Sequence, residues 1–502
     1  MDRPLLPLFL AVCGVFVATP SYGQTPLLNA RFGGIGLIGP ANSHPASVFY
    51  SPAALALRRG HHAFLEGSAI LRSGTVALSP VDPLTGKPQG GSAADQSFLN
   101  GQPSFYTVVS SDLGTESIVL AIAAGTPANS AVSLRRGGDS QTFDPVAQGA
   151  ARYHLVDFSA WHLYLTPSVS YQIVDEVVLG FGVSYVYGNI NFGFVRDVAL
   201  RGGSARDQAS EYAALDDCGN KTPCNYGADA AAEAIRVRGS ASGVAFHAGV
   251  LIRPTDRISI GVGYVSRVVA GFGDRAADGD AFVQRAKATI DNATVDVQEN
   301  LRGRATIGYR IPSVLSAGVN WQLKGRWALD LQGRWTQHSE FDRLEMRLSG
   351  SEFRDEPRVP DRIAHYRGTQ DSFALQIGGS YLLHPRVELQ AALMGETSAY
   401  EANAVSPATI DNFKLDGLIA ARIAIGQYFN LYLGYNLVLM IPRTVSDSAY
   451  DPSTLVRCVD SFFDVLTEDC QLANAGRGLA SSAGDYRLWQ HRFSLGLAIG
   501  VW

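Results

Sequence analysis

The stretch that decides the fold covers residues 31–60 and reads RFGGIGLIGPANSHPASVFYSPAALALRRG. Its first part is rich in glycine, which tolerates close backbone packing and positive φ. Its second part is a compact apolar run with a proline at which a short helix can begin. The residues that define this segment are Gly33, Gly34, Gly36, Gly39, Phe49, Ser51 and Pro52. Because so short a segment cannot build a core of its own, we predict that it is a plug held in the lumen of a β-barrel.

The chain before this stretch reads as a cleaved secretion signal. Arg3 supplies a positive start, residues 5–18 an apolar centre, and Ser21-Tyr22-Gly23 a small-x-small cleavage site. The sequence therefore predicts three parts: a signal peptide at residues 1–23, a plug or hatch at residues 24–60, and a transmembrane β-barrel at residues 61–502.

The composition agrees with a membrane barrel. Hydrophobic residues make up 46% and charged residues only 17% of the 502 residues, with 52 glycines and 20 tyrosines. Beyond the signal peptide, no apolar run approaches the ~18 residues of a membrane-spanning helix. A membrane protein without such helices has to be a closed barrel, because only helices and closed barrels satisfy every backbone group in lipid. The mean hydropathy of +0.04 fits strands that alternate apolar-out with polar-in.

Alternation of apolar and polar residues marks fourteen strand-like segments after residue 61. Short turns such as Asp112-Leu113-Gly114 alternate with long polar connections, which is the arrangement of outer-membrane barrels. The sequence thus predicts an all-β fold, a 14-stranded antiparallel transmembrane β-barrel with an N-terminal plug in the lumen. Residues 257–270, 302–323 and 327–348 are each expected to form one unbroken strand.

Four cysteines remain after the signal peptide, and four allow three pairings. Cys218 and Cys224 share one polar loop, and Cys458 and Cys470 share another. In an oxidising compartment such neighbours are favoured as disulfide partners, so we predict the bridges Cys218–Cys224 and Cys458–Cys470. Zinc binding is the alternative, but no histidines lie at ligand spacing near these cysteines.

Other functional classes find little support. A formal net charge of −5 gives no reason to expect nucleic acid as a partner. No G-x-S-x-G, H-E-x-x-H or P-loop sequence occurs, so we expect no enzyme activity, no cofactor and no bound metal. Gly34 to Gly39 does satisfy G-x-G-x-x-G, but a dinucleotide site needs a βαβ unit around it, and none follows.

The glycine-rich opening followed by SVFYSPAALA, residues 47–56, resembles the N-terminal hatch of the FadL/TodX family of outer-membrane transporters. The usual hatch motif of that family is asparagine-proline-alanine, and this chain has Ser51-Pro52-Ala53. His44 stands where an acidic residue is often found in the family. The run YEANAV at residues 400–405, with Pro407 and Asp411, resembles a late extracellular turn of the same family.

This resemblance implies passive uptake of long-chain fatty acids or other hydrophobic small molecules through the outer membrane of a Gram-negative bacterium. Outer-membrane lipid is then the surrounding partner, and we expect a monomer. In the family, substrate leaves sideways through a kink in the wall near the third strand. Gly125, Thr126 and Pro127 are the candidate strand breakers at that place.

By alternation, Arg310, Arg334 and Arg422 fall on the lumen face, where they are candidate ligand-binding residues. Arginine suits a substrate carboxylate because its planar fork binds both oxygens. The alternative is that these arginines are neutralised within the wall, with Asp330 and Asp416 as partners.

Two other functions stay open from the sequence alone. A general porin needs no apolar plug and conducts ions. A structural or adhesive barrel places its function in the long loops. The residues do not separate fatty acids from aromatic hydrocarbons, sterols or siderophore-like lipids as the substrate.

Overall fold

The structure is a computed structural model of the chain. It describes residues 35–79, 94–127, 130–134, 154–197, 232–269, 277–285, 288–290, 293–295, 300–308, 310–341, 343–354, 362–446 and 482–501. The predicted signal peptide and the four predicted disulfide cysteines lie outside these residues, as do Gly33 and Gly34.

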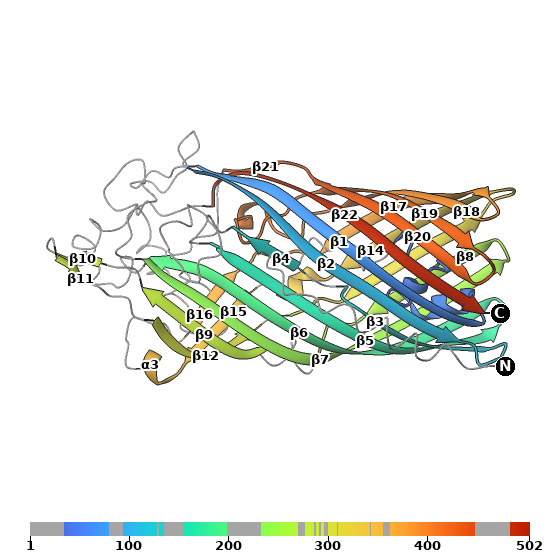
Figure 1. Ribbon diagram of the computed structural model, residues 1–502, viewed down its shortest axis with the longest axis horizontal. Coiled ribbons are helices and arrows are strands. Elements are labelled where there is room, and N and C mark those ends of the chain that lie inside the picture. The colour runs from blue at the N-terminus through green and yellow to red at the C-terminus, as the bar shows by residue number, and fades with distance from the viewer. Residues whose placement is uncertain are drawn as a thin grey trace.

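The described strands form one closed antiparallel barrel of fourteen strands (Figure 1). Closure comes from the pairing of the first strand, β1 (His61–Leu78), with the last, β22 (Gly484–Val501), over their whole length. Each strand pairs with its neighbours in the chain, so the barrel is of the up-and-down kind. The fold class predicted from the sequence is therefore confirmed.

Eight of the fourteen barrel strands are continuous. Besides β1 and β22 they are β2 (Ala94–Ser111), β5 (Asp157–Val174), β6 (Val177–Asp197), β7 (Ala232–Thr255), β18 (Val387–Glu396) and β19 (Lys414–Ile425).

The other six barrel strands each consist of two pieces. The pairs are β3 (Ile118–Gly125) with β4 (Ser130–Ser133), β8 (Ile258–Val265) with β9 (Ala277–Arg285), β12 (Asn300–Gly308) with β13 (Val314–Gln322), β14 (Trp327–Thr336) with β15 (Arg343–Ser349), β16 (Arg362–Tyr366) with β17 (Ser372–His384), and β20 (Phe429–Met440) with β21 (Arg443–Val445). A separate hairpin is formed by β10 (Ala288–Ile290) and β11 (Ala293–Val295).

The expectation of unbroken strands over residues 257–270, 302–323 and 327–348 was wrong, and the first of them ends at Val265. Pro312 has no N–H to donate to a ladder, and it lies in the gap between β12 and β13. The next strand is broken at the same level by the short 3-10 helix η5 (His338–Phe341). β13 consequently pairs with β8 and β14, whereas β12 pairs with β9 and β15.

Tight turns connect the strands at one end of the barrel, which we call the short-turn end. They join β2 to β3, β5 to β6, β7 to β8, β13 to β14, β17 to β18 and β19 to β20. In the first of these turns Leu113 and Gly114 both have positive φ, 53° and 70°, which matches the strand twist in a tight hairpin. The connections at the other end are long, as predicted.

The two faces of the wall differ as the alternation predicts. On β22, Phe493 and Leu495 point outward and are 51% and 57% exposed, whereas Arg492 and Ser494 point inward and are buried. The outer face is thus apolar, as a lipid-facing surface has to be.

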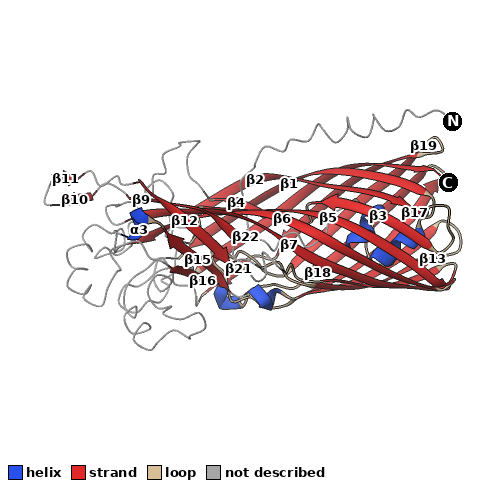
Figure 2. Cartoon of the chain, turned by 90° about the horizontal axis from the view of Figure 1, so that it is seen from below, coloured by secondary structure: helices blue, strands red, loops and turns tan. Residues whose placement is uncertain are grey.

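The N-terminal segment, residues 35–57, lies inside the barrel near the short-turn end (Figures 1 and 2). It forms two short 3-10 helices, η1 (Pro45–Phe49) and η2 (Pro52–Leu57), each beginning with a proline. Nearly all of its residues are buried. A further 3-10 helix, η6 (Ala402–Ala404), and a single helical turn, α3 (Ser351–Arg354), lie in long-loop connections. Among the described residues, no helix is long and apolar enough to cross a membrane.

Candidate functional site

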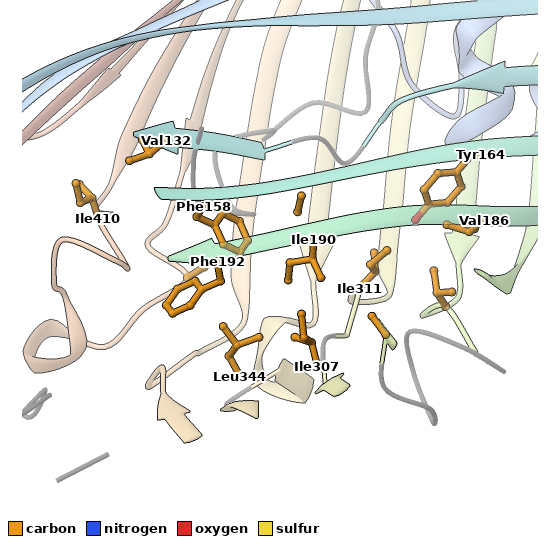
Figure 3. Close-up of a cluster of buried hydrophobic side chains, with 14 of the residues drawn as sticks. Val132, Phe158, Tyr164, Val186, Ile190, Phe192, Ile307, Ile311, Leu344 and Ile410 are labelled. Atoms are coloured by element: carbon orange, nitrogen blue, oxygen red, sulfur yellow. The ribbon is translucent and has the colours of Figure 1, made fainter. Parts of the chain in front are cut away.

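The half of the lumen nearer the long loops is lined by apolar side chains. Aromatic and aliphatic residues from distant strands point toward one another there (Figure 3). Those labelled in Figure 3 are Val132, Phe158, Tyr164, Val186, Ile190, Phe192, Ile307, Ile311, Leu344 and Ile410. Phe158 and Phe192 meet edge to face, with ring centroids 6.1 Å apart. Because a water-filled pore is lined by polar groups, this lining favours contact with apolar molecules.

The half nearer the short turns is polar, and it contains a buried ion pair. Arg492 Nη2 lies 3.4 Å from Glu66 Oε1, and both side chains are buried. Ser68 joins this pair, since it accepts a hydrogen bond from Arg492 at 3.1 Å. Buried polar groups require such partners.

The N-terminal segment is hydrogen-bonded to this polar wall. The backbone N–H of Ile35 donates to Glu66 Oε2 at 3.1 Å. Leu37 N–H donates to Gln390 Oε1 at 3.0 Å. Asn42 Nδ2 donates to Asp330 Oδ2 at 2.6 Å. The segment is thereby fixed to strands β1, β18 and β14, which lie on different sides of the lumen.

Glycines in the wall make room for the same segment. A Cβ atom added at Gly180, Gly249, Gly261 or Gly263 would come closer than 3.0 Å to atoms of the N-terminal segment. The atoms that it would meet belong to Ala53, Ser51, Pro40 and Tyr50, respectively. Since real Cβ atoms essentially never show such distances, these inward-facing glycines of β6, β7 and β8 allow direct backbone contact.

The predicted plug residues that the structure describes all lie in this segment. Gly36 has φ of +89°, a conformation that favours glycine. Gly39 donates its N–H to Ser47 Oγ at 3.4 Å, and Phe49 packs edge to face on Tyr106 at 5.5 Å. Ser51 Oγ donates to the carbonyl of Val262 at 3.4 Å. Pro52 begins η2.

The barrel wall is interrupted beside the third strand. β3 pairs with β2 only up to Gly125, opposite Tyr106. One more backbone hydrogen bond follows, from Thr126 N–H to the carbonyl of Phe105 at 3.1 Å. Beyond it, no ladder between β2 and β4 is found in the described part of the chain, and the contact between them is a side-chain bond, from Ser133 N–H to Asn100 Oδ1 at 3.2 Å. We call this gap the wall break.

A hollow lies next to the wall break on the lipid-facing side. Its lining includes Phe105, Thr126, Trp161 and Leu163 at the break. The same lining continues over β1, β22, β20, β19 and β18 as far as Tyr381 of β17 and Trp327 of β14. The outward side chains beside the wall break, Phe105, Trp161 and Leu163, are apolar.

The three candidate ligand-binding arginines are not brought together. Arg334 Nη2 lies 3.1 Å from Glu396 Oε2, and both side chains are almost completely buried. Arg422 Nη2 lies 2.6 Å from Glu388 Oε2 and is 38% exposed. Arg310 is exposed in the gap between β12 and β13, and it donates to the carbonyl of Glu340 at 3.4 Å.

The acidic partners proposed from the sequence, Asp330 and Asp416, are bonded to amides. Asp330 accepts hydrogen bonds from Asn42, Gln332 and Gln376, and Asp416 accepts one from Asn436. Within the described ranges, no cluster of three or more His, Cys, Asp or Glu residues is arranged to hold a metal ion.

The late segment at residues 398–412 is folded against the barrel. Tyr400 and Asp411 are fully buried. Asp411 accepts a hydrogen bond from Ala399 N–H at 2.7 Å and lies 2.6 Å from Lys414 Nζ. This buried ion pair fixes the connection between β18 and β19.

Sequence reasoning did not single out Asn42 or the four wall glycines. Asn42 lies between the glycine-rich run and the apolar run, and nothing in its neighbourhood predicts a buried carboxylate partner. The four wall glycines could have been found from the sequence, because the alternation of apolar and polar residues places all of them on the inward face of neighbouring strands.

A closed antiparallel barrel with an apolar outer face belongs to the class of transmembrane β-barrels. The sequence matches the model of the outer membrane protein transport family, OMPP1/FadL/TodX, over residues 38–410. The chain belongs to this family, and it is an outer-membrane β-barrel. The resemblance seen in the hatch motif is thereby confirmed.

Solved structures of the family share the fold. A FadL homologue from Pseudomonas aeruginosa superposes with a TM-score of 0.65 at 16% identity, covering 96% of this chain and 99% of its own. The toluene transporter TodX of P. putida gives 0.60 at 11% identity, and the toluene transporter TbuX of Ralstonia pickettii gives 0.54 at 14%, both with the same coverage. At these identities the likeness establishes the fold. No curated protein matches this chain in sequence.

Proposed function

We propose that this protein lets hydrophobic small molecules, hydrocarbons or long-chain fatty acids, cross the outer membrane down their concentration gradient. The observation that carries this proposal is the apolar lining of the lumen near the long loops. Membership of a family of transport channels supports it, as do the structural neighbours named as toluene transporters.

The direction of passage follows from the barrel's two ends. Outer-membrane barrels have short turns on the periplasmic side and long loops outside. A molecule captured among the long loops therefore meets the apolar lining first and the polar half of the lumen second. The wall break lies between them and the lipid, so we propose that Gly125, Thr126 and Pro127 mark a sideways exit.

We propose further that the N-terminal segment is a plug. It is buried in the lumen, hydrogen-bonded to β1, β14 and β18, and in backbone contact with β6, β7 and β8. Such a segment obstructs straight passage of water and ions, whereas an apolar molecule leaving through the wall break does not have to displace it.

The ion pairs of the candidate arginines indicate which substrates can bind in the lumen. Arg334 and Arg422 already face carboxylates, so a fatty-acid carboxylate gains little from them. Arg310 is exposed and bonded to a single carbonyl, which leaves it as the candidate among the three for an anionic substrate. Uncharged hydrocarbons need no such partner.

The proposal is tested with purified protein and a matched pair of ligands, a fatty acid and its alcohol. Native mass spectrometry should show that each stays bound. If Arg310 holds the carboxylate, Arg310→Met weakens fatty-acid binding tenfold or more, since a hydrogen bond to a charged group contributes about 1.5–3 kcal/mol. Alcohol binding should not change. Retention of neither ligand by the parent protein would contradict transport of hydrophobic molecules.

A further inference from the structure

The rim of the barrel at the short-turn end carries a basic sector. Lys324 and Arg326 lie in the turn between β13 and β14, His384 ends β17, and Arg386 lies in the turn that follows it, all of them exposed. The two turns adjoin, because Leu382 N–H donates to the carbonyl of Arg326 at 2.8 Å. The Arg326 side chain reaches the neighbouring turn and donates to the carbonyl of Leu383 at 3.2 Å.

The opposite part of the same rim carries charges of both signs, since Arg59 donates to the carbonyl of Thr115 at 3.3 Å and Arg253 donates to the carbonyl of Asp175 at 2.9 Å. Asp112 and Glu116 lie in the turn between β2 and β3, and Asp175 and Glu176 form the turn between β5 and β6. The backbone N–H groups of Gly114 and Gly60 donate to Asp112 and hold the pKa of its carboxyl below the usual value. The order of the strands places β3 and the wall break across the barrel from β14 and β17.

The cations of the basic sector are not neutralised by neighbouring acids. None of Lys324, Arg326 and Arg386 forms an ion pair with another residue that the structure describes. Glu388, the nearest carboxylate in the sequence, is turned inward to Arg422. Three like charges on two adjoining turns repel one another, so an anion between them is favoured.

Aromatic side chains lie directly beside these cations on the lipid-facing surface. Trp327 follows Arg326, is 55% exposed, and packs on Tyr381 with ring centroids 4.5 Å apart. Exposed tryptophan and tyrosine mark the level at which hydrocarbon meets the lipid headgroups. The cations are therefore held at headgroup level and not out in the water.

We propose that the basic sector binds the headgroup of an anionic phospholipid in the membrane leaflet at the short-turn end. The guanidinium groups of Arg326 and Arg386 and the ammonium group of Lys324 meet the phosphate, and Trp327 and Tyr381 pack on the glycerol and the first acyl carbons. A soluble anion would use the cations but not the lipid-facing rings. The site holds lipid on the wall opposite the break.

The test uses full-length protein in lipid nanodiscs of mixed phosphatidylglycerol and phosphatidylethanolamine. After release into mild detergent, native mass spectrometry counts which lipid stays on the barrel. The parent should retain phosphatidylglycerol preferentially, and the double variant Arg326→Gln/Arg386→Gln should lower this preference roughly tenfold or more. The matched control, Arg253→Gln/Arg257→Gln, removes the same charge from the end of β7 and the turn that follows it, and it should keep the preference.

Two further experiments distinguish binding of a lipid from binding of a free anion. Trp327→Leu/Tyr381→Leu should weaken phosphatidylglycerol retention with all cations in place, and excess inorganic phosphate should not displace the lipid. Equal retention of both lipids by the parent would overturn the proposal. An equal loss of phosphatidylglycerol in both arginine double variants would also overturn the proposal, because the effect would then come from net charge. Full displacement of the lipid by phosphate would overturn it as well, because the site would then be one for free phosphate.

Discussion

Asn42 Nδ2 donates a 2.6 Å hydrogen bond to Asp330 Oδ2, and this contact joins the N-terminal segment to strand β14 across 288 positions of sequence. Asp330 is 2% exposed, and it also accepts hydrogen bonds from the side-chain amides of Gln332 and Gln376. A buried carboxylate depends on such donors, since leaving it underbonded is strongly disfavoured. The contact therefore stabilises both the wall and the position of the segment.

Replacing Asn42 by alanine should loosen the segment. The loss should be about 1.5–3 kcal/mol of docking free energy, the range for a hydrogen bond to a charged group. We expect a larger and noisier ion conductance of the Asn42→Ala variant in planar bilayers. The matched control is Asn436→Ala, which removes a similar bond to Asp416 within the wall. Equal conductance changes in both variants would mean that the segment does not obstruct the lumen.

Adding a side chain at Gly263 should displace the segment by sterics alone. Its Cβ would collide with the carbonyl of Tyr50, whereas a Cβ at Gly333 would meet nothing within 4 Å. Gly263→Val should therefore raise conductance, and Gly333→Val should not. When residues 27–57 are deleted, Gly263→Val should have no additional effect. If Gly263→Val still raised conductance in the deletion variant, the substitution would act on the barrel wall and not on the N-terminal segment.

Arg334 and Glu396 should behave as a structural pair. Arg334→Met leaves Glu396 buried without its cation, which should cost about 3–5 kcal/mol of stability. The double variant Arg334→Met/Glu396→Leu should recover most of this loss, because no uncompensated charge remains. The temperature at which the barrel unfolds, read from heat-modifiability gels, measures the loss of stability in the single variant and its recovery in the double variant. Failure of the second substitution to rescue the first would assign Arg334 a role outside the pair.

The disulfide prediction concerns cysteines outside the described residues. Peptide mapping of oxidised protein should yield Cys218–Cys224 and Cys458–Cys470, since each pair closes a small loop. Reduction should leave the barrel folded, because none of the strand pairings described above involves these cysteines. Four unpaired thiols, or bridges only between the loops, would show that nearest-neighbour pairing is wrong.

The barrel was predictable from the sequence because strand alternation and short turns are local signals. The division of strands such as residues 302–323 into two pieces was not, since this stretch keeps its alternation on both sides of Pro312. Whether such a strand continues or changes its partners depends on its neighbours. Only the structure shows that β12 and β13 pair with different pieces of the same two neighbouring barrel strands.

The ion-pair partners of the candidate arginines can be predicted only when the register of the paired strands is known. Arg422 lies directly across from Glu388 in the β18–β19 pair, so hairpin register could have predicted that contact. Arg334 reaches Glu396 across an intervening strand, where Ala374 is the residue opposite both. The small alanine leaves room for the ion pair, and a single sequence gives no sign of this arrangement. Contacts of the N-terminal segment are also non-local, so composition predicted its burial but not its partners.

The central claim, passage of hydrophobic molecules through this barrel, is tested most directly by uptake into cells that lack their own hydrocarbon and fatty-acid transporters. Labelled toluene, a labelled fatty acid and a labelled sugar are followed with and without expression of the protein, in the presence and absence of an energy poison. The account predicts faster uptake of toluene or of the fatty acid, no change for the sugar, and no effect of the poison on entry. Faster uptake of the sugar as well would indicate a general porin, and unchanged uptake of all three would indicate a structural or adhesive barrel; either result would contradict the account.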